Sequence, residues 1–168
     1  MKALLALCYL LPACMTVGAD TFDFRQFKTA TYSVLNETEL GASEAERAYA
    51  DKVVLEIDHL LAQRLPFAGL SLSQNADLVI EVKMVAIKSG NALLRGTIGF
   101  GTGRAVTLFD VSFRTRDGSL LAVYRGGKAY SVLRPFPGEK RESLEARHAV
   151  AQIDAYIANN GRFPPNRE

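Results

Sequence analysis

The chain has 168 residues, of which 48% are hydrophobic and 23% are charged, and its formal net charge at pH 7 is +2. A nucleic-acid-binding protein usually carries a basic stripe, so this near-balance of charge argues against a nucleic-acid partner. The length and composition suit one globular domain with one hydrophobic core.

Residues 1–19 have the character of an export signal. Met1-Lys2 supply a short basic start, and residues 3–13 form an almost wholly apolar run without charge. A run of about ten residues is too short to span a bilayer, which takes about twenty, and it is typical of the central region of a secretory signal peptide. We therefore expect an exported protein.

Two cleavage positions fit this leader. In one, residues 11–14 (Leu-Pro-Ala-Cys) form a lipobox, so that residues 1–13 are removed and Cys14 becomes a lipidated N-terminus. The apolar run stops at the cysteine, as a lipobox requires, although Pro12 is an unusual residue at its position. In the other, residues 17–19 (Val-Gly-Ala) precede an ordinary signal-peptidase cut after Ala19.

The two cleavage positions predict different locations. Several acyl chains on Cys14 would hold the protein durably on a membrane, and Met15 in place of an aspartate favours the outer membrane, on the side that faces the periplasm. Cleavage after Ala19 would instead release a soluble periplasmic protein. We therefore expect the protein to contact the membrane only through the acyl chains on Cys14.

Cysteine and histidine usage excludes several chemistries. The only cysteines, Cys8 and Cys14, lie in the leader, so the domain has no disulfide, cysteine nucleophile or thiolate metal site. The only histidines, His59 and His148, have no metal-ligating partner four residues further on, which favours solvated or capping roles. We expect no cofactor and no metal.

The N-terminal half of the domain predicts a strand followed by a helix. Residues 20–26 are expected to be a tether, and residues 29–35 are rich in the β-branched and aromatic side chains of a strand. Ser43 and Glu46 have the spacing of a capping box, which starts a helix that Pro66 ends. Apolar residues at steps of three and four predict its buried stripe: Ala45, Tyr49, Val53, Ile57 and Leu60.

Three more strands follow. Residues 76–87 alternate in polarity and are apolar on both faces at first, which indicates a central strand. Residues 104–116 alternate again. Asp117-Gly118 predicts a tight turn because both residues tolerate positive φ. Residues 119–124 are the partner strand, with Gly126-Gly127 as a bulge.

A second amphipathic helix is expected over residues 142–159, closed by Asn160-Gly161. The predicted domain covers residues 27–161 and has the order β-α-β-β-β-α, with residues 162–168 as a polar tail. Packing favours an α+β fold in which two helices cover one face of a mixed, mostly antiparallel sheet of about four strands. The other face of the sheet is expected to be partly exposed to solvent or used for binding.

A glycine-rich stretch is the candidate binding loop: Gly99, Phe100, Gly101, Thr102, Gly103 and Arg104. Its backbone amides can curl around an anion, to which Arg104 would add charge. It leads into a strand, however, whereas dinucleotide and phosphate motifs open a helix. A strand entry with close backbone approach is the alternative interpretation.

No catalytic signature is present. The chain lacks the G-x-S-x-G elbow of serine hydrolases. Asp110 shares a strand face with Ser112, and the simplest interpretation is that this face is exposed to solvent. Glu81 and Lys83 predict a cross-strand ion pair. We therefore expect a protein that is not an enzyme.

Several of these segments resemble a bacterial lipoprotein family known as domain of unknown function 4410. The resemblance rests on residues 65–70 at the end of the first helix, residues 76–80 at the start of a strand, the Gly-Phe-Gly-Thr-Gly-Arg-Ala motif of residues 99–105, and the Asp-Gly turn. It covers roughly residues 27–158. It implies an α+β envelope lipoprotein and brings no established activity or catalytic residues.

These observations predict an exported cell-envelope lipoprotein that binds a protein partner or helps to assemble a complex. The rival hypotheses are a soluble periplasmic ligand-binding module and a small hydrolase that would use Asp110 with Arg104.

Overall fold

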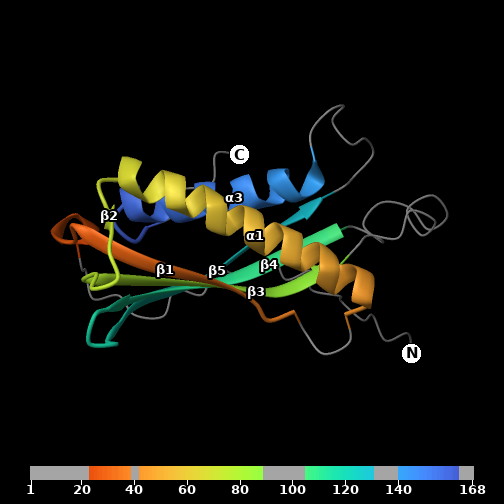
Figure 1. Cartoon of the computed structure of the whole chain (residues 1–168), viewed down its shortest axis with the longest axis horizontal. Coiled ribbons are helices and arrows are strands. Elements are labelled where there is room, and N and C mark those ends of the chain that lie inside the picture. Colours follow the sequence, from red (N-terminus) through yellow and green to blue (C-terminus); the bar gives the residue numbers. More distant parts are fainter. Residues whose placement is uncertain (1–22, 39–41, 89–104, 131–139, 163–168) are drawn as a thin grey trace, which may run out of the picture.

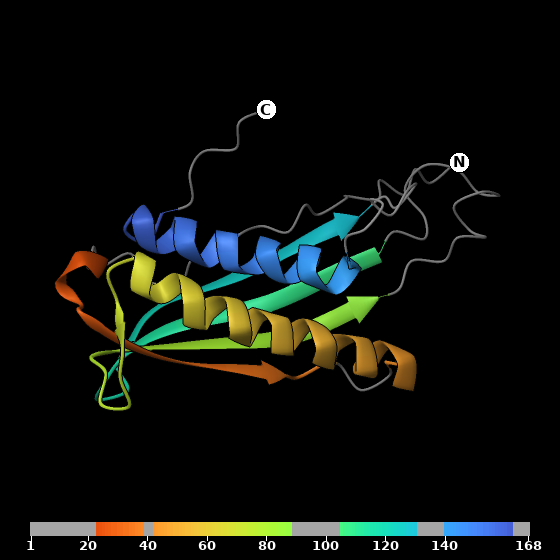
Figure 2. The ribbon, with the colours of Figure 1, turned by 45° about the horizontal axis from the view of Figure 1, so that its top comes forward.

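The computed structural model describes residues 23–38, 42–88, 105–130 and 140–162. Cys14, the leader with its two cleavage positions, and the loop from Gly99 to Arg104 lie outside these residues. In the described part, one sheet carries two helices on one face (Figure 1), and Figure 2 shows the two helices side by side.

The sheet has five strands in the order β2-β1-β3-β4-β5. Their bounds are β1, Thr29–Asn36; β2, Ser71–Leu72; β3, Leu78–Lys88; β4, Ala105–Thr115; and β5, Leu120–Tyr130. β1 runs parallel to β2 and β3, whereas β3, β4 and β5 are antiparallel neighbours. The predicted α+β class is confirmed. The fifth strand was not predicted, because β2 pairs through only two residues, too few to show a period.

Helix α1 spans Glu44–Phe67 and begins at the predicted capping box. The Ser43 hydroxyl accepts a hydrogen bond from the Glu46 N–H at 3.3 Å, and the Glu46 carboxylate accepts one from the Ser43 N–H at 2.9 Å. Of the predicted stripe, Val53 and Ile57 are buried, Tyr49 and Leu60 are half-buried and pack against the core, and Ala45 is exposed. The residues that face the core are Ala50, Val53, Ile57, Leu61 and Leu65. The stripe is rotated because α1 packs on the sheet and on the second helix at once.

The β4–β5 hairpin closes with a three-residue loop, one residue longer than the predicted tight turn. Thr115 N–H donates to the Ser119 carbonyl at 2.9 Å. Gly118 alone takes a positive φ, of 89°; Asp117 instead accepts from the Ser119 N–H at 3.1 Å. The register then shifts by one residue at Leu121. This bulge compensates for the longer loop, an arrangement that three-residue hairpins often use.

The predicted bulge at Gly126-Gly127 is wrong. β5 runs without a register shift through both glycines, which pair with Phe109 and Leu108 of β4. A Cβ on Gly126 would lie 2.4 Å from a ring carbon of Phe109 and 2.5 Å from the side-chain oxygen of Gln152. Glycine is therefore required here by close approach, the other role that a strand glycine can have.

Helix α3 spans Arg141–Ala158 and ends as predicted. Asn160 and Gly161 both take positive φ, and the Gly161 N–H donates to the Tyr156 carbonyl at 2.9 Å. Within the expected tether, Phe24–Gln26 form the short 3-10 helix η1, and Phe24 is buried. The Phe24 N–H donates to the Asn160 side chain at 2.6 Å, so the two ends of the described chain meet.

The core fills the space between the helices and one sheet face. Its aromatic centre is a cluster in which neighbouring ring centroids lie 4.8–6.2 Å apart, formed by Phe24, Phe113, Tyr124 and Tyr156. The side chains that alternate with the core residues along β3, β4 and β5 point to the opposite face, which no described helix or strand covers (Figure 2).

Candidate functional site

The uncovered face of the sheet carries a row of charges that crosses the strands. Lys83 of β3, Asp110 of β4 and Arg125 of β5 are consecutive partners in the strand register. Arg125 donates to both oxygens of Asp110, from Nε at 2.6 Å and from an Nη at 2.7 Å. This bidentate geometry is the strong form of an arginine–carboxylate pair, and it holds Asp110 in place across the hairpin.

The predicted cross-strand ion pair joins Lys83 of β3 to Glu37, which follows β1, with Nζ 2.9 Å from the carboxylate. Glu81, on the same strand as Lys83, lies 3.8 Å from that Nζ. The hydrogen bond to Glu37 and the charge of Glu81 raise the pKa of the Lys83 ammonium. Glu81 in turn accepts from Ser112 at 3.3 Å. The charged side chains of this row are therefore paired with one another.

Apolar side chains separate these charges. The half-buried aliphatic residues on the uncovered face include Val79, Val85, Leu108 and Val123. The uncovered face therefore mixes half-buried aliphatic side chains with paired charges.

A buried polar cluster lies under the N-terminal turns of both helices. The Glu145 side chain is fully inaccessible to solvent. One carboxylate oxygen accepts from the Thr107 hydroxyl at 2.6 Å and the other from Arg141 Nε at 2.9 Å. The Arg141 guanidinium lies 5.2 Å from the centre of the Tyr49 ring, in the range of a cation–π contact. Burial, and then the Glu145 charge, raise the pKa of the Tyr49 hydroxyl.

The sequence carries two signals for this cluster. Thr107 alternates along its strand in step with Phe109 and Val111, and Glu145 precedes Ala146 on the buried side of its helix. A polar residue on the buried side of each of two elements usually finds its partner on the other. The cluster joins α3 to β4, and its carboxylate is closed to a substrate because the Glu145 side chain has no solvent-accessible surface.

Neither histidine takes part in a metal site in the described residues. His59 is exposed and lies 2.9 Å from the side chain of Gln63, and His148 lies at the same distance from Gln152. No group of three or more metal-ligating side chains occurs within the described ranges. No helix there combines the length and the apolar character needed to cross a bilayer.

Two open pockets lie away from the charged face. One, of about 560 Å³, is lined by Phe27, Asp77, Thr115, Arg116 and Asp117, next to the hairpin loop. The other, of about 380 Å³, lies beside the edge of the sheet at β1 and is lined by Ala30, Thr31, Tyr32, Asp58, Leu72, Ser73 and Gln74.

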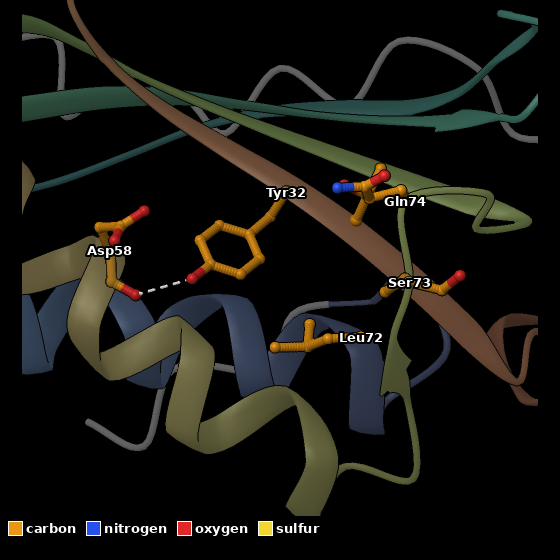
Figure 3. A pocket seen from close by; sticks show the side chains of 7 residues that line it. Tyr32, Asp58, Leu72, Ser73 and Gln74 are labelled. Atoms are coloured by element: carbon orange, nitrogen blue, oxygen red, sulfur yellow. Dashed lines mark hydrogen bonds between the residues drawn. The ribbon is translucent and has the colours of Figure 1, made fainter.

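The pocket beside β1 is floored by Tyr32. Figure 3 shows the ring pointing from β1 toward α1, where its hydroxyl donates to the backbone carbonyl of Asp58 at 3.1 Å. Leu72 of β2 closes one end and is 43% exposed. Partial burial and the Asp58 charge raise the pKa of the Tyr32 hydroxyl.

Comparison with known proteins identifies a family and a remote structural likeness. The chain is 11% identical to the PelC dodecamer from Paraburkholderia phytofirmans, with a TM-score of 0.48, over 84% of this chain and 96% of that one. A variant of that PelC gives 13% identity and a TM-score of 0.48, over 89% of this chain and 98% of the other. No curated protein matches the chain. Residues 24–133 match the model of the domain of unknown function DUF4410, and the chain therefore belongs to the DUF4410 family.

Proposed function

We propose that this protein is a non-catalytic accessory protein of the cell envelope that binds a partner protein through the uncovered face of its sheet. The supporting observation is that face itself, with its bidentate Asp110–Arg125 pair and its aliphatic residues. An interface of this composition gains from apolar burial without leaving a charge unpaired, which would be costly.

The leader supports the location. An apolar run that ends at Cys14 suits export followed by lipidation, and a lipid anchor would keep the domain at the outer membrane on the periplasmic side. Among the described residues, Asp110 is held in a bidentate pair with Arg125, which supports a structural role for this carboxylate over the catalytic one of the hydrolase alternative. A general acid or base needs an oxygen that can reach the substrate.

The anchor is tested by the intact mass of the mature protein purified from membranes, beside a Cys14→Ser variant. The expected result is a lipid-sized increment on a chain that begins at Cys14 and that the variant lacks. An unmodified chain that begins at Asp20 would refute the anchor and leave a free periplasmic domain.

The binding face is tested by photo-cross-linking in living cells. A photoreactive residue in place of Val123, on the uncovered face, should give a discrete adduct with a second protein. The matched control replaces Ala151, which is exposed on α3 on the opposite side of the sheet. Adducts of equal yield from both positions, or from neither, would count against the sheet face as the interface.

A further inference from the structure

The edge of the sheet at β1 is open along most of its length. β2 pairs with β1 only at Thr29 and Ala30, and the chain then leaves the edge. The last backbone contact joins the Ser73 N–H to the Ala30 carbonyl at 3.1 Å. From Thr31 to Asn36 no described strand pairs with β1 on that side. At about 3.3 Å per residue this is roughly 20 Å of strand edge.

The hydrogen-bond pattern identifies the backbone groups that face this edge. In a strand, successive residues direct their N–H and C=O to alternate sides. The carbonyls of Lys28 and Ala30 bond toward β2, whereas the Glu37 N–H bonds to Met84 of β3 at 2.8 Å. Even-numbered residues therefore face the open edge, so Tyr32 and Val34 each present an N–H and a C=O there.

One face of helix α1 forms a wall above this edge. Asn36 donates to the Asp51 carboxylate at 2.6 Å, and Tyr32 donates to the Asp58 carbonyl. Leu55 lies between the two aspartates on the same side of the helix and is 71% exposed. With Leu72 at the end of the edge, this wall combines exposed leucines with carboxylates, and no ion pair of Asp51 or Asp58 occurs among the described residues.

We propose that the β1 edge is a docking site for an extended segment of a partner protein, which adds to the sheet as a further strand and carries basic side chains toward α1. Strand addition satisfies the backbone groups of Tyr32 and Val34. Lysine or arginine side chains on the side of α1 would lay their aliphatic stems over Leu55 and Leu72 and place their charges at the two carboxylates. β-Branched side chains suit the alternate positions, beside Leu35, which is 41% exposed.

The pocket beside Tyr32 supports this occupant. Its volume of about 380 Å³ is enough for one or two side chains of a docked strand, and it opens directly onto the free edge (Figure 3). The β1 edge and the uncovered sheet face are separate surfaces, so either can bind while the other does not.

Binding of a synthetic peptide to the mature chain tests the proposal. The probe is the capped hexapeptide Lys-Val-Lys-Val-Lys-Val, measured by fluorescence anisotropy beside the same sequence with glutamate for lysine. The lysine peptide should bind and the glutamate peptide should not. Asp58→Lys should weaken binding roughly tenfold. The matched control, Glu56→Lys, makes the same charge reversal on the opposite side of α1 and should leave the affinity within about twofold.

Hydrogen exchange separates strand addition from simple charge attraction. In the free protein the amides of Tyr32 and Val34 should exchange quickly, and the lysine peptide should slow them. The N–H groups that reach β1 belong to the valines in a parallel strand and to the lysines in an antiparallel one. Of two peptides, one N-methylated at the valines and one at the lysines, one should therefore bind at least about tenfold more weakly than the unmodified peptide.

Three results would overturn the proposal. The first is equal loss of affinity in Asp58→Lys and Glu56→Lys. The second is an undiminished affinity of both N-methylated peptides. The third is protection of the Tyr32 and Val34 amides before peptide is added, which would mean that another segment of this chain, or a second copy seen by sedimentation, already occupies the edge.

Discussion

At Gly126, the absence of a side chain allows the sheet and helix α3 to pack closely together. Its position on β5 faces the core, where the buried Phe109 ring and the Gln152 side chain occupy the space that a Cβ would need. The sequence signal, two glycines in a strand, is compatible with a bulge or with close approach. Only the position of α3 over the sheet decides between them, and that position depends on contacts between residues far apart in the chain.

Gly126→Ala should lower the free energy of unfolding by about 1–3 kcal/mol, the usual cost of overpacking a core. The Gln152 side chain can swing away, but the Phe109 ring is fully enclosed, so most of the strain falls on β4. Urea denaturation measures the change. The further replacement Phe109→Leu should recover part of the loss.

Gly118→Ala is the comparison for the Gly126 variant. Nothing lies within 4 Å of a Cβ at Gly118, so its cost of about 1–2 kcal/mol should come only from its φ of 89°. Phe109→Leu should therefore not relieve it. Relief of both glycine variants by the same leucine would contradict steric crowding at Gly126.

At the scale of elements, periodic sequence patterns predicted the long strands and both helices. The Ser43 capping box and the Asn160-Gly161 ending are confirmed because each depends on residues close together in the chain. The position of β1 beside β3, in contrast, depends on residues far apart in the chain. The two strands are parallel and are joined through the α1 crossover, and no local pattern in β1 distinguishes a parallel from an antiparallel neighbour.

The same distinction applies to the candidate sites. The pairing of Asp110 with Arg125 was within reach of the sequence, because the two residues are equally distant from the centre of the Asp117-Gly118 turn. The extra loop residue and the bulge at Leu121 cancel, so the simple register holds. The partners of Glu145 were out of reach, because they depend on how α3 lies against β4.

Glu145 should stabilise the contact between α3 and β4 through its two hydrogen bonds. Glu145→Ala leaves the buried Thr107 hydroxyl without its partner and should lower the free energy of unfolding by about 1–3 kcal/mol. Glu142→Ala, a half-exposed neighbour in the first turn, should cost only about 0.5 kcal/mol. Chemical denaturation of both variants gives the comparison.

A double-mutant cycle assigns the Glu145 effect to the Thr107 contact. Thr107→Val alone should also destabilise the protein, but adding it to Glu145→Ala should cost much less than the sum of the two changes, with a coupling of about 0.5–3 kcal/mol. Strictly additive losses would mean that the hydrogen bond between them contributes nothing to the contact.

For the whole molecule, the asymmetry between the two sheet faces is the main organising feature. One face is filled by α1, α3 and η1, and the other carries only side chains of the strands (Figure 2). Both proposed binding surfaces, the uncovered face and the β1 edge, are places where the sheet has no described neighbour. Substitutions there should act on binding, whereas substitutions under the helices should act on stability.

The two ends of the described chain are joined at Phe24, so its removal should affect the whole fold. The Phe24 ring packs against Phe113 and Tyr156, with centroids 4.9 and 5.9 Å away. Phe24→Ala should therefore lower the free energy of unfolding by about 3–5 kcal/mol. Phe67→Ala is the control, because Phe67 is 87% exposed at the end of α1 and should change stability by less than about 0.5 kcal/mol. Equal midpoints for the two variants in thermal denaturation would show that η1 is not part of the cooperative core.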